Sequence, residues 1–420
     1  MSVVRQAGRH GDDSRARLAS LDQLRGLVIV VMALDHVRDF FHTGSYRGES
    51  PLDVDHTSLV LYVTRWITHL CAPTFVFLAG VGAYWRGHRA PGPFTGNAKA
   101  ALSRFLLTRG LWLCVLELTY VNWLGWSMSF EPRLYGLKVI FALGAAMVAL
   151  AGLIWLPHRV VAALGIAIVA LHNLTDGWVA SGALAPVWRI LHVQSPITEW
   201  TAIQVRVSYP VLPWLGVMLL GYAFGPLAMA PAAVRQRWQL RFGLGALAVF
   251  AVLRGLDLYG NPTPWTARGD WLRSFGAMVD VAKYPPSLAY VLATLGFALL
   301  IWRWLDAAAP RALGWLTVFG AVPMFVYLLH LPLVHLLSAA FHQVLRGDGG
   351  FLIGTRYVAG GGANIGHAFV PAQSWPAAPG FALGVVYLVW IALVLALYPV
   401  ARWFADVKRR HRDWAWLSYL

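Results

Sequence analysis

The chain has 420 residues, of which 58% are hydrophobic and only 13% are charged. Soluble globular domains carry about 25% charged residues, so this composition excludes a disordered chain, a coiled coil and an ordinary soluble enzyme. The formal net charge is +15. In a membrane protein such an excess of Lys and Arg collects in cytoplasmic loops, so we expect no nucleic-acid partner. Repeated apolar runs of about 20 residues predict a polytopic membrane protein.

Ten apolar segments are candidates for membrane spans. They cover roughly residues 22–42, 59–85, 101–125, 136–156, 159–172, 209–228, 241–257, 284–304, 313–342 and 380–403. The fifth is short, and we expect Pro332 to break the ninth. The prediction is an all-α transmembrane helical bundle over residues 21–404, between a cytoplasmic tail at 1–20 and a basic cytoplasmic tail at 405–420.

Lys and Arg are unequally distributed between alternate loops. With the N-terminus in the cytoplasm, 20 of them fall in cytoplasmic segments, 11 in outer segments and three inside spans. The positive-inside rule then predicts that both termini are cytoplasmic. Residues 1–20 are polar and charged residues interrupt the apolar run that follows, so we expect a permanent first helix and not a signal peptide. Cys71 and Cys114 fall in predicted spans, which favours free thiols over a disulfide.

Most of the ionisable residues of the first span share one face. At 100° per residue, six side chains fall within an arc of about 100°: Asp22, Arg25, Ile29, Met32, His36 and Asp39. Arg38 lies on the opposite side, near the outer end, where we expect it to extend toward the interface. Arg25 and His36 are about 16 Å apart along the axis, which places Arg25 near the cytoplasmic entrance.

His36 is the candidate catalytic base in this span. Asp35 and Asp39 flank it and are expected to orient the imidazole and raise its basicity. Ionisable groups inside a membrane are costly and usually face a cavity or a partner. The alternative is a polar cluster that only fixes helix packing, and for Asp22 and Arg25 a structural ion pair is an equally good interpretation.

Two further spans carry candidates. In the second, Arg65 and His69 lie four residues apart on one face, and His69 is expected to form a second wall of an acceptor site. A core histidine beside a kink at Pro73 is the alternative. In the third, Arg104 and Arg109 lie near the cytoplasmic end, where they are candidates for binding a phosphate group. The positive-inside rule alone also explains these two arginines.

Candidates near the outer side complete the set. Lys283 and Tyr284 open the eighth span, and Lys283 is a candidate for holding an anionic or carbonyl group, although a simple helix entry explains the same residues. His330 precedes Pro332 in the ninth span, where a broken helix frees backbone groups into a cavity. We expect no metal, because no His-Glu-x-x-His motif occurs and five residues separate His36 from His42.

These motifs together are similar to a known family. The pattern Leu21-Asp22-x-x-Arg25-Gly26, an apolar run and Asp35-His36 resembles the start of bacterial relatives of the heparan-α-glucosaminide N-acetyltransferase catalytic domain. Further segments resemble the same family: 65–73, 75–80, 109–112, 283–287 and 322–330. The resemblance runs from about residue 17 to the C-terminus, and the first helix also resembles the wider membrane acyltransferase superfamily.

The resemblance implies transfer of an acetyl group from cytosolic acetyl-CoA to an amino sugar across a bacterial inner (plasma) membrane. One departure changes the expected roles. The animal enzyme's pattern has Asn where His36 stands, and its key histidine lies eleven residues later, where this chain has Arg47. His42 is the nearest substitute. We therefore expect that His36 has taken the role of the base, and that the acceptor need not be glucosamine.

The resulting hypothesis is a membrane acyltransferase with acetyl-CoA or another acyl-CoA as donor and an outer sugar or glycan as acceptor. The catalytic candidates are His36, Asp35 and Asp39; the acceptor-binding candidates are His42, His69, Lys283, Tyr284 and His330; the donor-binding candidates are Arg25, Arg104 and Arg109. Direct transfer and a ping-pong route through acylated His36 both stay open, as does a homodimer, and membrane lipids are expected partners. The alternative function is a proton-coupled transporter with a His/Asp relay, although no inverted repeat is evident.

Overall fold

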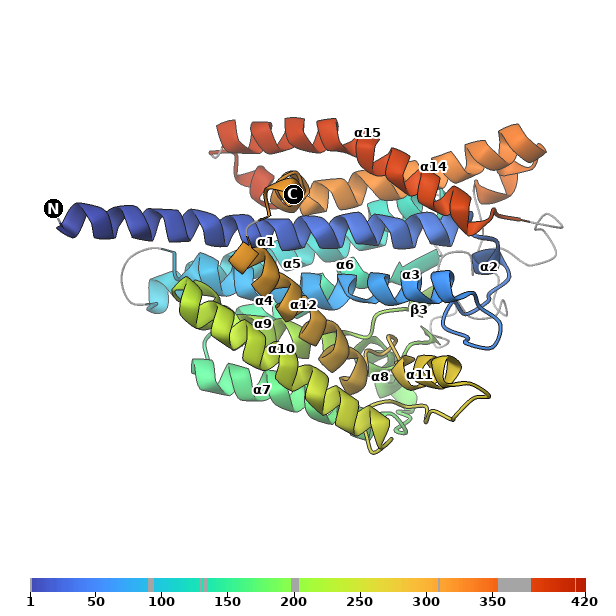
Figure 1. The fold of residues 1–420 in the computed structure, drawn as a ribbon, viewed down its shortest axis with the longest axis horizontal. Helices are drawn as coiled ribbons and strands as arrows, with labels where there is room; N and C mark the ends of the chain where they lie inside the picture. Colours follow the sequence, from blue (N-terminus) through green and yellow to red (C-terminus); the bar gives the residue numbers. More distant parts are fainter. Residues whose placement is uncertain are drawn as a thin grey trace.

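A computed structural model describes residues 2–89, 94–128, 130, 134–197, 204–308, 310–353, 379–411 and 413–420. The chain is 76% helical, and its long helices run roughly along one axis (Figure 1). The longest, α1 (Ser2–Phe41), packs against helices from both halves of the sequence: α4 (Cys71–Gly87), α12 (Leu288–Ala308), α13 (Leu316–Ala321), α14 (Pro323–Arg346) and α15 (Leu383–Arg410). α1 is therefore the helix around which the later elements assemble.

The other elements complete the bundle and its loops. They are α2 (Thr43–Tyr46), α3 (Leu59–His69), α5 (Gly96–Leu116), η1 (Glu117–Ser127), α6 (Val139–Leu153), α7 (His158–Leu171), η2 (His172–Thr175), η3 (Gly182–Leu184), α8 (Ala185–His192), α9 (Val211–Met229), α10 (Ala232–Gly255), α11 (Trp271–Val279), η4 (Arg311–Leu313), η5 (Gly349–Leu352) and η7 (Ala415–Ser418). A small sheet, absent from the all-α prediction, joins β1 (Leu134–Leu137), β3 (Gln204–Val207) and β2 (Pro196–Ile197) in that order, with β1 parallel and β2 antiparallel to β3.

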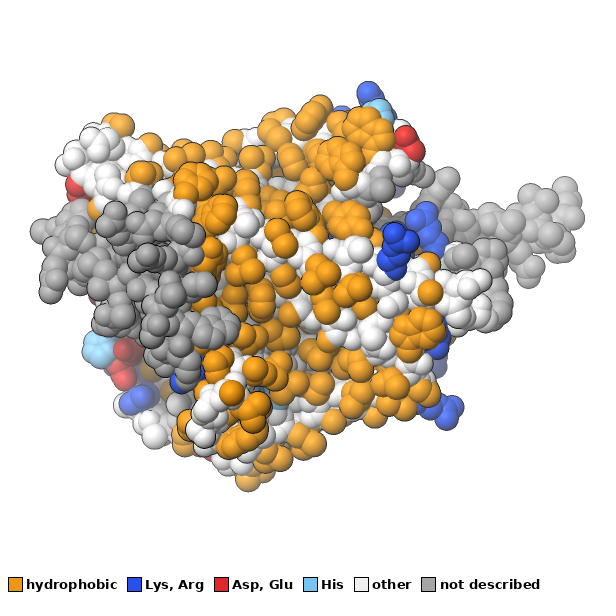
Figure 2. All heavy atoms as spheres, turned by 180° about the vertical axis from the view of Figure 1, so that it is seen from behind, with side chains coloured by type: hydrophobic (Ala, Val, Ile, Leu, Met, Phe, Trp, Pro, Cys, Tyr) orange, Lys and Arg blue, Asp and Glu red, His pale blue; other side chains and the backbone are white. Residues whose placement is uncertain are grey.

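Six helices of the described chain are long and apolar enough to cross a membrane. They are Leu59–Gly87, His158–Thr175, Val211–Met229, Leu288–Ala308, Pro323–Arg346 and Leu383–Arg410. The helix α1 is not among them, because charged residues interrupt its apolar run. A broad belt of hydrophobic side chains covers one face of the molecule, and charged side chains gather at its two ends (Figure 2). The chain is therefore built as an integral membrane protein; ten spans with both termini inside stay a prediction.

The expected break in the ninth span is at a different proline. The chain leaves the helix at Val322, and Pro323 begins α14, whereas α14 continues through Pro332. A proline lacks the N–H that would bond to the carbonyl four residues earlier. The carbonyl of Leu328, which Pro332 leaves unpaired, instead accepts a hydrogen bond of 3.0 Å from the hydroxyl of Tyr120. An external donor of this kind allows a proline to stay inside a membrane helix.

A proline that leaves a backbone carbonyl unpaired also marks the place where the second expected span is divided. It consists of α3 and α4, which meet at Leu70. Pro73 lies in the first turn of α4 and leaves the carbonyl of His69 without its helical partner. The hydroxyl of Tyr290 on α12 donates to that carbonyl at 2.8 Å. Tyr290 thus stabilises the helix junction that presents His69 and Arg65.

The third expected span changes helix type before it ends. After α5 the chain continues as a π-helix, η1, which ends at Met128 in the left-handed conformation. Its Asn122 side chain bonds to the carbonyls of Glu117 and Gly136, which attaches η1 to β1. π-helical segments are rare and occur often at functional sites. Here the altered winding places Trp126 beside α1.

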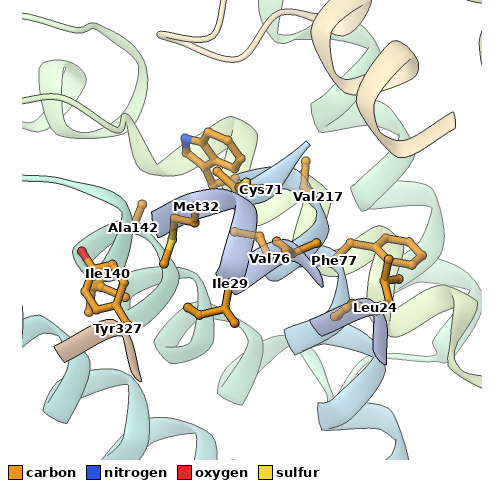
Figure 3. Packing of buried hydrophobic residues seen from close by; sticks show 14 of the residues in the cluster. Leu24, Ile29, Met32, Cys71, Val76, Phe77, Ile140, Ala142, Val217 and Tyr327 are labelled. Carbon is orange, nitrogen blue, oxygen red and sulfur yellow. The ribbon is translucent and has the colours of Figure 1, made fainter. Parts of the chain in front are cut away.

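Apolar side chains from five helices meet around the middle of α1. Ile29 and Met32 face residues of α4, α6, α9 and α14, as Figure 3 shows with Val76, Ala142 and Val217 among the labelled side chains. Within a bilayer, lipid tails are as apolar as these side chains, so helix association depends on close packing. Both cysteines are free, Cys71 buried in this core and Cys114 partly buried, which confirms the expectation of free thiols.

Glycines provide the closest contacts between helices. A Cβ atom on Gly26 would lie 1.9 Å from the carbonyl oxygen of Leu316, and one on Gly320 would lie 1.8 Å from that of Asp22. The backbones of α1 and α13 therefore touch through a reciprocal pair of glycines. Close packing of the two backbones therefore explains why a glycine follows Arg25 in the sequence.

Candidate active site

His36 lies on α1 inside the bundle and is 8% exposed. Its Nδ1 is 2.7 Å from Nε2 of His330 on α14. The rings of Trp126 and Tyr327 meet the His36 ring at 88° and 69°, with centroid distances of 5.4 Å and 6.2 Å. The expected acceptor residue His330 thus belongs to a histidine pair with His36, in a largely aromatic enclosure.

The hydrogen bonds determine the tautomers of this pair. Nδ1 of His330 is 2.9 Å from the carbonyl oxygen of Val326, which can only accept, so this nitrogen carries the proton. In the neutral ring, Nε2 of His330 then accepts from Nδ1–H of His36. Nε2 of His36 therefore retains its lone pair, which is the form that a general base requires.

Asp35 is the centre of a buried ion-pair cluster. Nη1 of Arg65 is 2.8 Å from both carboxylate oxygens, and the hydroxyl of Thr68 donates to one of them at 2.9 Å. Nη2 of Arg38 lies 3.1 Å from an oxygen of the Asp35 carboxylate, and Nζ of Lys283 lies 4.0 Å from one. The carboxylate connects α1 to α3 and to the segment before α12, while the hydrogen bond at Nδ1 of His36 goes to His330.

The prediction that Arg38 extends toward the interface is wrong. Arg38 is 5% exposed, and its Nη2 is 2.6 Å from Asp39 and 3.1 Å from Asp35. An isolated guanidinium in this position would carry a large desolvation penalty. The two carboxylates on the same turns of α1 compensate its charge, so the side chain stays inside the bundle.

A cavity of about 620 Å³ opens at the end of the bundle where α1 finishes. We call this end the cavity end. The cavity brings together four of the five acceptor-binding candidates and one catalytic candidate: His42, His69, Lys283, Tyr284 and Asp39. Its other walls include Arg38 and Arg65. Asp39 lies three residues beyond His36, or about 4.5 Å along the helix axis. His36 and His330 themselves are not among the residues that line the cavity.

The histidines in the cavity wall are held differently. His42 precedes α2, and its Nδ1 accepts from the backbone N–H of Gly44 at 3.1 Å, which leaves Nε2 as the protonated nitrogen of the neutral ring. His69 is 1% exposed, and its Nδ1 has no hydrogen-bond partner among the described residues. A buried nitrogen without a partner is a candidate contact for a ligand in this cavity.

Lys283 and Tyr284 are fixed by the loop that leads into α12. The side chain of Asn261 accepts from the N–H of Ala282 at 2.9 Å. The hydroxyl of Tyr284 is 3.2 Å from that of Tyr209, and Nζ of Lys283 is 5.2 Å from the Tyr284 ring centroid. Contacts with neighbouring residues therefore fix the positions of Lys283 and Tyr284, in addition to their place at the entry to α12.

The rim of the cavity carries an exposed ion pair. Nδ1 of His56 is 2.9 Å from a carboxylate oxygen of Asp53. Burial by itself would raise the pKa of Asp53, but the hydrogen bonds from His56 and from the backbone of Asp55 lower it. The hydrogen bond to Asp53 and its negative charge raise the pKa of His56. This pair is solvated and lies outside the buried cluster.

Cations from three helices converge at the opposite end of the bundle. Arg25 is 3.3 Å from Asp22 and lies within electrostatic range of Arg109 on α5 and Lys408 on α15. We call this end the basic end. Lys408, which the sequence presented only as part of a basic tail, is here a neighbour of two donor-binding candidates. The third candidate, Arg104, is exposed on α5, and no described contact joins it to this group.

A family model for the catalytic region of heparan-alpha-glucosaminide N-acetyltransferase matches residues 17–259. This match covers more than half of the chain. The chain belongs to this family. Membership indicates a membrane acetyltransferase, in agreement with the resemblance seen in the sequence. No curated protein matches the chain.

The family match covers some site residues and not others. It includes His36, Arg65 and His69 with the helices that carry them, as well as Arg25 and Arg109. It ends before the loop that leads into α12, which carries Lys283 and Tyr284, and before α14, which carries His330. The structure, and not the match, therefore brings these later residues to the cavity and to His36.

Sequence reasoning missed two neighbours of the site. Trp126 is one of 21 tryptophans, and only the π-helical winding of η1 turns it toward His36. Lys408 lies in a run of basic residues of the kind that binds lipid headgroups. The position of α15 against α1 and α13 gives it a second role as a neighbour of Arg25.

Proposed function

We propose that this protein transfers an acetyl group from acetyl-CoA, bound at the basic end, to an amine or hydroxyl of a sugar or glycan bound in the cavity. The observation that carries the proposal is the His36–His330 pair, which leaves a lone pair at Nε2 of His36, about one helical turn from the cavity residue Asp39. Membership of the acetyltransferase family supports the reaction class.

The direct reaction needs one base and one positioned acceptor. Nε2 of His36 takes the proton from the acceptor amine or hydroxyl, and the freed lone pair attacks the thioester carbonyl carbon. The carbon–sulfur bond breaks, and the CoA thiolate takes the proton back from His36. His330 holds the imidazole through Nδ1 and disperses part of the positive charge that forms during transfer.

The ping-pong route uses the same nitrogen in a different order. Nε2 of His36 attacks the thioester first, and the acetyl group is carried on the imidazole until the acceptor takes it. The orientation by His330 serves both routes, since each needs a lone pair at Nε2. Rapid-quench trapping of acetylated His36 in the absence of acceptor distinguishes the two.

Charge supports the placement of the donor. CoA carries several phosphate charges, and Arg25, Arg109 and Lys408 form a cluster of cations able to hold them. The distance from Arg25 to His36 is about 16 Å along α1. The extended pantetheine arm would have to cover this distance between phosphate site and thioester.

The decisive test is acetyl transfer from labelled acetyl-CoA to amino sugars by the purified protein in proteoliposomes. We expect transfer by the parent protein and a loss of at least about 100-fold in kcat for His36→Gln, with acetyl-CoA binding unchanged. His158→Gln, which alters a half-buried histidine at the start of α7 that does not line the cavity, is the matched control and should retain activity. Full activity in His36→Gln would overturn the assignment of the base.

A further inference from the structure

A second cluster of ligating side chains lies outside the proposed active site. His172 follows α7 in η2, Asp176 follows that short helix, and His192 ends α8. One ligand atom from each of the three lies within 4.8 Å of the others. The residues are four and sixteen positions apart, so no local motif indicates the cluster. It forms where the end of α8 meets η2, with the His172 and His192 ring centroids 5.6 Å apart.

Unsatisfied nitrogens make this cluster unusual. Both ring nitrogens of His172 and Nδ1 of His192 are buried and make no hydrogen bond of ordinary geometry among the described residues, although the carbonyl of Pro286 lies near the His172 ring. The two residues are 4% and 1% exposed. Buried polar atoms are nearly always satisfied, so several such nitrogens in one place need a physical explanation. A cation bound between the rings would account for one nitrogen of His172, because each imidazole gives a metal one nitrogen, and Nε2 of His192 would be the second ligand.

The donor set matches a transition metal. Two imidazoles and one carboxylate are ligands that Zn²⁺ accepts readily, with a water in the fourth position. Tetrahedral ligation at about 2.0–2.1 Å places the ligand atoms roughly 3.3 Å from one another. Nε2 of His192 and Oδ1 of Asp176 are already 3.1 Å apart. Small side-chain rotations would close the remaining distances.

Neighbouring groups orient the ligands as they do in metal sites. The side chain of Asn173 donates to Oδ2 of Asp176 at 2.9 Å, and its oxygen accepts from the N–H of Leu288 at 2.9 Å. The hydroxyl of Thr175 lies 3.2 Å from Nε2 of His192. Asn173 therefore connects the cluster to the start of α12.

We propose that His172, Asp176 and His192 bind a divalent transition metal, with Zn²⁺ as the preferred ion. The ion holds η2 against α8 and, through Asn173, against the first turn of α12. This is a site separate from the histidine pair at His36, and its test does not depend on the proposed acetyl transfer.

Metal binding to the purified, tag-free protein tests the proposal. After chelator treatment and readdition of Zn²⁺, we expect one tightly bound equivalent and a higher thermal midpoint. Co²⁺ in place of Zn²⁺ should give visible absorption bands of a tetrahedral nitrogen and oxygen site. His172→Ala and His192→Ala should lose the equivalent, and Asp176→Asn, at an exposed position, should weaken binding by more than about tenfold.

The control is His56→Ala, which removes an exposed histidine paired with a carboxylate but outside the cluster. It should bind Zn²⁺ as the parent does. Should a histidine variant fail to fold, Asp176→Asn and the Co²⁺ spectrum of the parent still decide. Equal Zn²⁺ stoichiometry and affinity in the parent and in Asp176→Asn, or Co²⁺ bands absent from the parent, would overturn the proposal.

Discussion

At the scale of single residues, a hydrogen bond at one nitrogen of His36 determines what the other nitrogen can do. The carbonyl of Val326 fixes His330, and His330 fixes His36. The aspartate that the sequence placed beside His36 is engaged by Arg65 and Thr68. Asp35, the neighbour of His36 in sequence, thus bonds to other residues. His330, which is 294 positions away, supplies the contact that orients the His36 ring.

Substitution of His330 tests this orienting contact. We expect His330→Leu to lower kcat about 100-fold with little change in the KM for either substrate, because His36 loses its acceptor at Nδ1. His330→Gln should retain more activity, since its amide oxygen can accept the same hydrogen bond. Steady-state kinetics on variants with matched thermal midpoints provide the measurement. Equal losses of kcat in His330→Leu and His330→Gln would contradict the proposal that His330 acts through its hydrogen bond to His36.

Asp280, in the loop after α11, gives a prediction for pH. Burial raises the pKa of its carboxyl to about 6, although Arg254 opposes the shift. Because the folded form holds this proton more tightly than the unfolded form, its contribution to stability falls as the pH rises from about 4 through 6. Asp280→Asn should therefore increase the free energy of unfolding by about 1–2 kcal/mol at pH 7.5, which is measured as a higher thermal midpoint. At pH 4 the substitution should give no gain.

The control for this pH effect is Asp413→Asn, which changes an exposed carboxylate at the other end of the bundle. The midpoint of each variant is compared with the parent at pH 4, 5.5 and 7.5. A gain in Asp280→Asn that is the same at all three values would indicate a contact effect and contradict the titration.

At the scale of elements, prolines and glycines determine how the helices meet. Pro73 and Pro332 each leave a carbonyl unpaired, and a tyrosine hydroxyl from another helix satisfies each one. These two bonds hold α3, α4 and α14, the helices that carry Arg65, His69 and His330. The backbone contact at Gly26 fixes the position of α1 relative to α13.

Gly26→Ala tests the contact between α1 and α13. The new methyl group would overlap the carbonyl oxygen of Leu316, and backbone atoms on both helices would have to shift. We expect a loss of about 1–3 kcal/mol or failure to assemble, measured as the thermal midpoint in detergent. The matched control is Gly245→Ala on α10, where the methyl group meets no atom within 4 Å. Unchanged stability in Gly26→Ala would contradict the close approach.

At the scale of the whole molecule, charge is divided between two ends. The basic end holds Arg25, Arg109 and Lys408, whereas the cavity end combines cations with Asp39, Glu49 and Asp53. The helix α1 connects the ends and carries the histidine between them. This arrangement suits two substrates that approach one reactive group from opposite sides.

A pair of arginines on α5 tests the division between the ends. Arg109→Gln should raise the KM for acetyl-CoA about tenfold, because one charge-assisted contact to a phosphate is worth about 1.5 kcal/mol. Its KM for the acceptor should not change. Arg104→Gln on the same helix removes an equal charge from an exposed position and should have little effect. Equal changes in both variants would show that only the overall surface charge matters.

Much of the whole-molecule description followed from the sequence alone. Composition and repeated apolar runs of about 20 residues determined a helical membrane protein, since a run of this length fits a helical span, and a helix satisfies its own backbone hydrogen bonds inside a bilayer. The motif Asp22-x-x-Arg25-Gly26 with Asp35-His36 indicated the family, and the periodicity of a helix placed Arg25 and His36 about three turns apart. These features are local, so a single segment of sequence carries them.

Tertiary structure decided what distant segments do to one another. Only the packing of α14 on α1 pairs His330 with His36, and only the winding of η1 brings Trp126 to them. Arg38, which its helical position turned outward, is buried because Asp35 and Asp39 compensate its charge. The continuity of α14 through Pro332 depends on Tyr120 of η1, which donates to the carbonyl that the proline leaves unpaired. Most of these contacts join residues that are far apart in the chain, so the periodicity of a single helix cannot predict them.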